Sequence, residues 1–356
     1  MNRKVGAFAL ATLLPIPVLI AAGIWGGWVM AFACVYLSTL TFLLDELIVF
    51  AAEDSQPGVE FPAARWLSIL LGMLHIPVLL FAAATISGAF GAGPIEQVAA
   101  LFAFGLYFGQ VSYSNAHELI HSARRLPFWL GTLVYSSTLY GHHVTAHRHI
   151  HHRYVGSDDD PNTARLGESF YGFAARAWTS SARLGLKVEN RSQRARYGRI
   201  KPLRHMYAVY AGIGLTMMVG VTWAFGVAGL ISFLLLSIYA TAQILLADYV
   251  QHYGLKRASL PNGKLEPIGV EHSWNAPHPV SAALMLNAPR HSDHHAHPSK
   301  PFEALDLPEE DEAPMLPYSL PAMSTIALFP PFWRRAMDDR AAEWSRDGAV
   351  TAMAAE

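Results

Sequence analysis

Six long apolar runs restrict most strongly how this chain can fold. A helix needs about 20 apolar residues to cross the hydrocarbon core of a bilayer. Runs of this length lie at roughly 5–25, 28–50, 66–90, 95–116, 206–226 and 228–250. Apolar residues make up 52% of the chain and charged residues only 15%, which is more apolar than an ordinary soluble domain. We therefore expect an all-α integral membrane protein with six transmembrane helices, built as a single domain over 1–356.

The positions of Lys and Arg predict the topology. If the N-terminus is cytoplasmic, three connections between the runs lie outside, and none of them holds a Lys or Arg: 26–27, 91–94 and 227. The basic residues fall instead at the N-terminus, in 51–65, in 117–205 and in the C-terminal part. Since positive charge marks cytoplasmic loops, we expect an inner (plasma) membrane protein with both termini cytoplasmic. Its cytoplasmic cap would comprise 117–205 and 253–356.

Two segments of this cap differ from the rest in composition. The apolar run 126–141 is too short to span and separates clusters that must share a side, so we expect a buried or re-entrant segment. The stretch 183–204 is strongly basic. In a membrane protein such a stretch favours anionic headgroups or an acidic protein partner over nucleic acid. Cys34 is the single cysteine, which excludes disulfides and iron–sulfur ligation within the chain.

Histidines cluster in two stretches of the cap, 117–152 and 252–297. Nine of them form the patterns HxxxH, HxxxHH, DYVQHYG and HxxHH: His117, His121, His147, His151, His152, His252, His291, His294 and His295. Imidazole suits iron, copper, zinc and nickel, whereas magnesium and calcium prefer oxygen. Nine imidazoles exceed what one ion can use. The sequence therefore predicts a binuclear metal centre on the cytoplasmic side.

Helical spacing predicts how some of these rings are shared. His117 and His121 are four residues apart and lie on one helix face, so both can reach one ion. His147 and His151 repeat that spacing, with His152 turned to a neighbouring direction. His149 faces elsewhere. His252 is isolated in sequence, but it ends the last apolar run, where the other clusters converge.

Polar neighbours of these motifs are candidates for outer contacts of the metal centre. We select Glu118, Asp248, Asp293, His142 and His272, with His143, Asp158, Asp159, Asp160 and Glu271 as weaker candidates. A carboxylate such as that of Asp293 can orient a ligand histidine through its other ring nitrogen.

Two other functional classes compete with a binuclear centre. The letters from His117 to His121 spell HExxH, which in an intramembrane zinc protease would make Glu118 the general base. That interpretation leaves seven clustered histidines without a role. A metal transporter or storage protein would favour ligand pairs on opposite half-helices, whereas here the ligands gather at one face.

The motifs resemble those of the membrane-bound alkane 1-monooxygenases, histidine-rich non-haem di-iron enzymes of the fatty acid desaturase-like superfamily. The matching stretches, in the family's order, are HELIH, HRHIHH with DDDPNTARLGESFY, DYVQHYGL, EHSWN, RHSDHHAHP and FPPFWRRAMD. The resemblance implies that the same nine histidines bind two iron ions. The chain departs from the family pattern at Ala146, Ile150 and Gln251, where Glu, Gly and Glu are usual.

The resemblance also implies the activity and the partners. We expect O2-dependent terminal hydroxylation of medium-chain alkanes or alkyl groups to 1-alkanols. Electrons would come from a rubredoxin, or a ferredoxin, and its NAD(P)H reductase, because the chain has no flavin motif. The apolar substrate would arrive from the bilayer, and the predicted tunnel residues are Trp25, Trp28, Phe42, Leu43 and Leu44. A di-iron fatty acid or lipid desaturase, or a hydroxylase of a lipid, carotenoid or aromatic methyl group, remains an alternative.

Overall fold

The computed structural model describes residues 3–47 and 62–354, and their side chains over 5–47 and 63–344. These residues form helices and two isolated β-bridges but no strand, which confirms the all-α prediction. The predicted 51–65 connection lies mostly outside the described residues.

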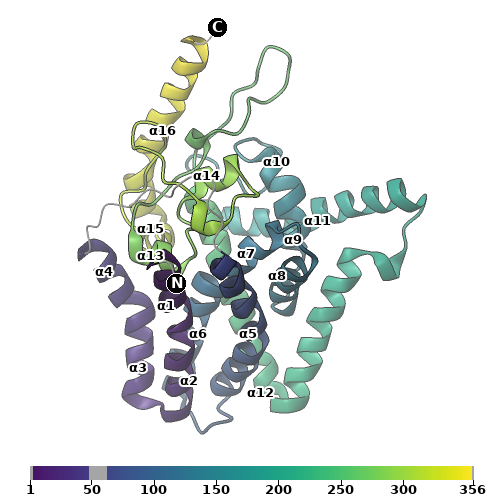
Figure 1. Cartoon of the computed structure of the whole chain (residues 1–356), viewed down its shortest axis with the longest axis vertical. Coiled ribbons are helices and arrows are strands. Elements are labelled where there is room, and N and C mark those ends of the chain that lie inside the picture. The colour runs from purple at the N-terminus through teal and green to yellow at the C-terminus, as the bar shows by residue number, and fades with distance from the viewer. Residues whose placement is uncertain (1–2, 48–61, 355–356) are drawn as a thin grey trace.

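Helices of the N-terminal third stand side by side (Figure 1). They are α1 (Arg3–Leu13), α2 (Pro15–Trp25), α3 (Gly27–Val35), the π-helical turn η1 (Tyr36–Leu40), α4 (Thr41–Leu47), α5 (Pro62–Ile86) and α6 (Pro94–Tyr107). Contacts join α2 to α3, α3 to α6, and α5 to α6. The turn between α2 and α3 uses Gly26 and Gly27, both with positive φ, which glycine adopts without strain.

The remaining helices include one long apolar helix and many short ones. They are the π-helical turn η2 (Phe108–Ser112), α7 (Tyr113–His121), α8 (Arg125–Ser137), α9 (His142–Ala146), the π-helical turn η3 (His147–His151), α10 (His152–Tyr154), α11 (Phe170–Tyr197), η4 (Pro202–Arg204), α12 (Met206–Gln251), η5 (Val270–His272), α13 (Pro279–Leu284), α14 (His291–Ala296), η6 (Phe302–Ala304), α15 (Leu320–Ala327) and α16 (Pro330–Ala354).

Among the described residues, four helical stretches are long and apolar enough to cross a membrane: Val5–Trp25, Gly27–Leu47, Ala63–Ile86 and Met206–Gln251. The last contains two predicted runs, because Gly226 leaves helical geometry (φ 66°, ψ −160°) and the chain turns back there (Figure 1). The predicted run 95–116 is helical but is not among the four. Six membrane crossings therefore stay a prediction.

One glycine of α6 and one of the following turn (Phe108–Ser112) let this segment approach α12 closely. A Cβ at Gly105 would lie 1.9 Å from the Tyr239 ring, and one at Gly109 would lie 2.3 Å from the Gln243 side chain. Gln243 Nε2 also donates a 2.6 Å hydrogen bond to the Gly105 carbonyl oxygen. This close packing holds the second arm of α12 against the helix that leads to His117.

The short helices form a cap at one end of the molecule (Figure 1). In α16, Trp333, Met337 and Ala341 are buried at a spacing of four residues, so one face of this helix packs against the cap. They pack in one cluster with Tyr249 and Tyr253 at the end of α12. The run 126–141 forms α8, which contacts α5, α7 and α12.

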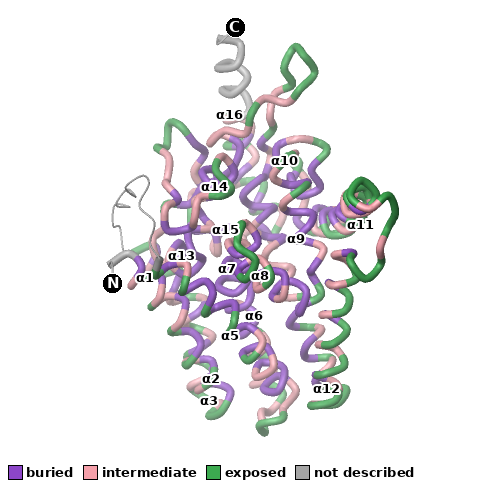
Figure 2. Tube along the Cα trace, turned by 45° about the vertical axis from the view of Figure 1, so that its right-hand side comes forward, coloured by how far each residue is buried: buried purple, intermediate pink, exposed green. Residues whose placement is uncertain are grey.

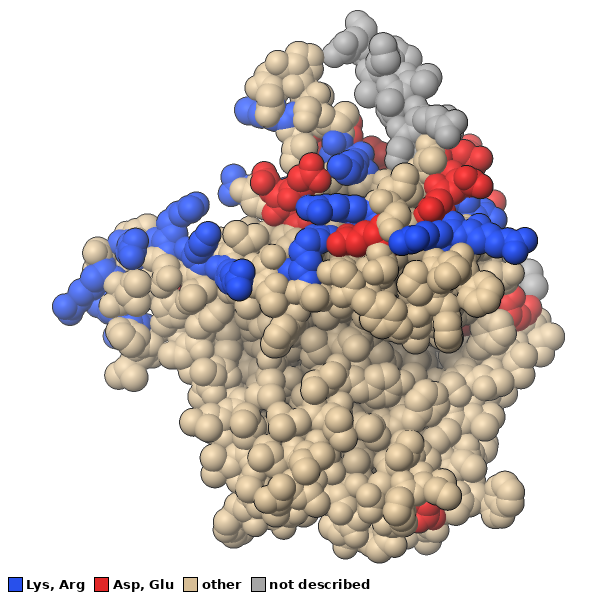
Figure 3. Space-filling view, turned by 180° about the vertical axis from the view of Figure 1, so that it is seen from behind, with Lys and Arg blue, Asp and Glu red and all other residues tan. Residues whose placement is uncertain are grey.

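Charge separates the cap from the apolar helices. Lys, Arg, Asp and Glu gather toward the cap, and the surface below is nearly free of them on the face shown (Figure 3). Exposed residues cover the outer faces of the helices below the cap (Figure 2). Several are large and apolar, including Trp28 at 91% and Trp223 at 88% exposure. An uncharged belt with exposed apolar side chains is the surface expected of a membrane protein.

Candidate metal centre

Nine buried or half-buried histidines meet in two groups at the base of the cap. We call His117, His121, His147, His152 and His294 the five-histidine group, and His151, His252, His291 and His295 the four-histidine group. Within each group the potential ligand atoms all lie within 4.8 Å of one another. The structure thus brings together all nine histidines selected from the sequence and divides them five to four.

A π-helical turn decides how the HxxxHH motif is divided. Residues five apart face the same way across a π turn, because its hydrogen bonds join i to i+5. The turn η3 spans His147 to His151, so His152 shares the face of His147, and their Nε2 atoms are 2.9 Å apart. His151 points into the four-histidine group. The predicted His147/His151 pairing is therefore wrong: the two rings serve different groups.

Helix α14 also serves both groups. His291 and His295 are four residues apart and share the four-histidine group, with their Nε2 atoms 3.0 Å apart. His252, at the end of α12, has its Nε2 atom 3.0 Å from that of His291. His294 turns to the five-histidine group, where its Nε2 atom is 3.2 Å from that of His152.

The spacing of the ring nitrogens fits metal ligation. In the five-histidine group the Nε2 atom of His147 lies 2.8 Å from that of His117 and 3.1 Å from that of His121. Ligand nitrogens about 2.0–2.1 Å from one ion and at right angles to each other are about 3 Å apart. A neutral imidazole offers one donor. The close nitrogen pairs are therefore too many to be all hydrogen bonds. The residues therefore fit a pair of metal ions.

Burial keeps these imidazoles neutral. Desolvation lowers the pKa of His147, His152, His294 and His295 well below the usual range, and the neighbouring histidines lower it further. A ligand histidine must be neutral. These four rings are therefore available to a cation at neutral pH.

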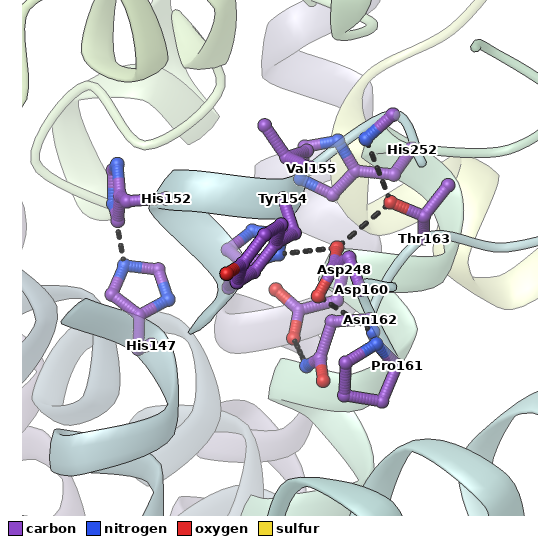
Figure 4. A network of polar contacts seen from close by, with 12 residues as sticks. His147, His152, Tyr154, Val155, Asp160, Pro161, Asn162, Thr163, Asp248 and His252 are labelled. Carbon is purple, nitrogen blue, oxygen red and sulfur yellow. Dashed lines mark hydrogen bonds and ion pairs between the residues drawn. The ribbon is translucent and has the colours of Figure 1, made fainter. Parts of the chain in front are cut away.

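A carboxylate network orients one ring of the four-histidine group (Figure 4). His151 Nδ1 donates to Asp160 Oδ2 at 2.8 Å, which leaves the buried Nε2 atom of His151 without a hydrogen-bond partner. Burial alone would lower the pKa of His151, but Asp160 raises it above its usual value. Asp160 also accepts from the Thr163 hydroxyl at 2.7 Å and from the backbone amide of Asn162 at 3.1 Å. Such a partner fixes the tautomer of a ligand histidine.

The other predicted outer contacts have different outcomes. Asp248 belongs to the same network, because its Oδ2 atom accepts from Asn162 Nδ2 at 2.5 Å. For Asp293 the prediction is wrong: its carboxylate contacts His297, Lys300 and the backbone amide of Asp306 rather than a clustered histidine.

Three further candidates lie beside the site without joining either group. His272 accepts from the Gly269 amide and contacts Glu266, while its backbone carbonyl meets the His252 ring. The ring of His142 packs against Tyr140. Glu118 is half-buried near Glu303, and desolvation followed by this second carboxyl raises the pKa of Glu118 to about 8.

An apolar cavity of about 860 Å³ reaches both groups. Its walls come from η1 and α4, α6 and η2, the second arm of α12, and the cap segment 285–328. His117 of the five-histidine group and His291 of the four-histidine group line it. Of the predicted tunnel residues, Phe42 lines the cavity. Trp25, Trp28, Leu43 and Leu44 do not.

Asp160 is only a weaker candidate from the sequence, and Asn162 is not among the candidates. A local signal was present, because the stretch DDDPNT follows the HRHIHH motif directly. The division of the HxxxHH histidines between the two groups could not be predicted in this way, because the histidine spacing does not indicate a π turn.

Comparison with known proteins identifies relatives of this chain. A model of the fatty acid desaturase family matches residues 95–327. Alkane 1-monooxygenase 1 of Alcanivorax borkumensis is 30% identical, over 90% of this chain and 79% of the relative. Alkane 1-monooxygenase 1 of Pseudomonas aeruginosa is 29% identical, over 84% and 79%. The xylene/toluene monooxygenase hydroxylase component XylM of Pseudomonas putida is 27% identical, over 67% and 63%.

Proposed function

Because the chain belongs to the fatty acid desaturase family, and within it to the alkane 1-monooxygenases, an oxidoreductase group, we propose that it converts medium-chain alkanes or alkyl groups to 1-alkanols with O2. The observation that carries this proposal is the apolar cavity that ends at a histidine of each group. An apolar chain in that cavity can present its terminal methyl group to both groups at once.

We assign one iron ion to each histidine group, as two ions suit nine imidazole donors. The bound irons would supply the activation of O2 that an unactivated C–H bond requires. The protein's own residues do the remaining work. Asp160 holds the Nδ1 proton of His151 and so leaves its Nε2 lone pair free, which would let His151 hold an ion of the four-histidine group.

The cavity walls position the substrate and exclude water. Phe42, Phe102, Leu106 and Ile244 give the cavity an apolar lining suited to an alkyl chain. The cavity also touches η1 and α4, in a helical stretch apolar enough to span, which supports arrival of the substrate from the bilayer. We propose that this space accepts a substrate of medium chain length.

The electrons must come from another protein, and we propose a rubredoxin-type donor, or a ferredoxin, with its NAD(P)H reductase. The support is chemical: the chain carries one cysteine, Cys34, which cannot by itself ligate an iron–sulfur cluster. The donor would dock on the cap. The distribution of Lys and Arg supports an inner-membrane location with the cap and both termini in the cytoplasm.

The family match and the likeness to XylM favour one alternative, desaturation or hydroxylation of a lipid or an aromatic methyl group. The zinc protease alternative has less support, because His117 and His121 lie among three further histidines of their group.

Product analysis tests the proposal. The purified protein is supplied with O2, rubredoxin, its reductase and NADH, and offered octane, dodecane, a fatty acyl lipid or xylene. His295→Ala serves as the inactive control and His149→Ala as the matched active control. Formation of 1-octanol or 1-dodecanol supports the proposal. An unsaturated acyl product or a benzylic alcohol without alkanol moves the chain to the alternative.

A further inference from the structure

The C-terminal half of α11 and the turn after it carry a dense group of cations. Residues 183–204 contain eight basic side chains and one acidic side chain. We call the eight the basic ledge: Arg183, Lys187, Arg191, Arg194, Arg196, Arg199, Lys201 and Arg204. Lys and Arg gather on an arm that projects from the body, at the level where the charged cap gives way to the uncharged belt (Figure 3).

The ledge has no internal counter-charge. Among the side chains that the structure describes, none of the eight forms an ion pair with a carboxylate. The single acid, Glu189, is occupied by neutral partners: it accepts from Gln193 Nε2 at 3.0 Å and from the Met206 amide at 3.3 Å. Eight positive charges and one negative charge leave the segment at +7.

Three of these cations converge on one aromatic ring. From the ring centroid of Tyr197, the Arg196 guanidinium carbon lies at 5.3 Å, Lys201 Nζ at 4.5 Å and the Arg204 guanidinium carbon at 5.9 Å. The turn is fixed in place, because Gln193 Nε2 donates to the Arg204 carbonyl oxygen at 2.9 Å. Like charges held this close repel one another, and an anion between them removes that repulsion.

Apolar side chains adjoin the same cations. Leu203, between Lys201 and Arg204, is 96% exposed, and Ile200 is also exposed. The chain then continues directly into α12, whose first arm exposes Trp223. Cations beside exposed apolar side chains at the end of an apolar helix match the headgroup region of a bilayer. An acidic soluble protein would leave Leu203 without an apolar environment.

We propose that the basic ledge binds anionic phospholipid headgroups, with a phosphate seated among Arg196, Lys201 and Arg204. Basic side chains near an anionic membrane surface add their attractions, and Leu203 would reach toward the acyl chains. Helix α11 also packs against α9, which directly precedes His147. Lipid binding would therefore steady the helix behind the metal centre.

Thermal unfolding in mixed micelles tests this proposal on the full chain. The wild type is compared with the ledge variant R196Q/K201Q/R204Q and with a matched variant of exposed cap cations, K264Q/R335Q/R340Q. Phosphatidylglycerol should raise the melting temperature of the wild type and the matched variant by several degrees more than phosphatidylcholine does. The ledge variant should lose most of that difference, and glycerol phosphate should give no shift.

Three results would overturn the proposal. The first is an unchanged response of the ledge variant to phosphatidylglycerol. The second is an equal shift of the wild type with glycerol phosphate. The third is a ledge variant that binds lipid normally but is reduced more slowly by an acidic donor protein. If the triple variant does not fold, native mass spectrometry of Lys201→Gln provides the test. Retention of as many phosphatidylglycerol molecules as the wild type then contradicts the proposal.

Discussion

The two histidine groups differ in burial and in how their rings are held. In the five-histidine group His117, His121 and His152 are only half-buried, whereas all four members of the other group are buried. The carboxylate of Asp160 accepts a hydrogen bond from His151 and so serves the four-histidine group. The five-histidine group thus offers more donors, whereas the four-histidine group offers fewer donors, one of which, His151, is held by a carboxylate.

His147→Ala should have the largest effect and should separate the groups. The Nε2 atom of His147 lies within 3.1 Å of three other ring nitrogens in the five-histidine group. Its loss should remove the ion of that group and reduce turnover by more than the roughly 10–100-fold typical of an outer contact. Metal analysis and product assays measure both effects. His149→Ala is the control, and loss of both ions together would show that the groups are not separate sites.

Asp160→Asn should affect the four-histidine group alone. Without the carboxylate, His151 loses the partner that fixes its tautomer, so metal affinity or activity should fall by about 10–100-fold. Asp293→Asn is the matched control, since its partners lie outside both groups. Competitive chelation followed by turnover assays measures the change. Equal effects of the two substitutions would contradict the asymmetry between the groups.

Sequence spacing identified the nine histidines but not their division. The four-residue spacing of His117 and His121 predicts a shared face, and both do lie in one group. His291 and His295 have the same spacing and also share a group. The pairing of His147 with His151 fails because a π turn occupies those residues. Periodicity assumes a regular helix, and the insertion that creates a π turn is set by packing of the whole cap.

Phe42→Ala should change substrate preference and spare both histidine groups. Phe42 lines the cavity that reaches both groups but belongs to neither of them. Removing the ring enlarges the apolar space. Relative turnover of dodecane over octane should rise several-fold, within the range that added methylene groups contribute in apolar pockets. Competition assays with mixed alkanes give the ratio. Trp28→Ala, at a position outside the cavity lining, should leave it unchanged, and a shift of equal size there would place the substrate route elsewhere.

Asp45→Ala should have the smallest effect and should not distinguish the groups. Asp45 Oδ1 accepts from the backbone amides of Val280 and Ser281 at 2.8 and 3.0 Å, which ties α4 to α13. Losing such a cap costs about 0.5–2 kcal/mol. Glu46→Ala is the control, since its exposed carboxylate is 3.8 Å from His278 and an exposed pair contributes about 0–1 kcal/mol. Thermal unfolding would contradict this assignment if the two variants melted together.

Some features of the fold, like the choice of the nine histidines, follow from local sequence, whereas others depend on tertiary contacts. Within the part of the chain that the structure describes, apolar runs located the four stretches that can span a membrane, and the turn inside the last of them falls at Gly226. The cavity lining was mostly missed, because apolar character cannot distinguish a side chain that faces lipid, such as Trp28, from one that faces a cavity, such as Phe42.

Metal content per chain tests the central claim most directly. Iron, zinc and copper would be measured by mass spectrometry in the purified wild type, His147→Ala and His295→Ala. We expect two irons per chain in the wild type and about one in each variant, because each substitution removes a ligand from a different group. A single zinc in the wild type, or a single iron that either substitution abolishes, would contradict the two-site account.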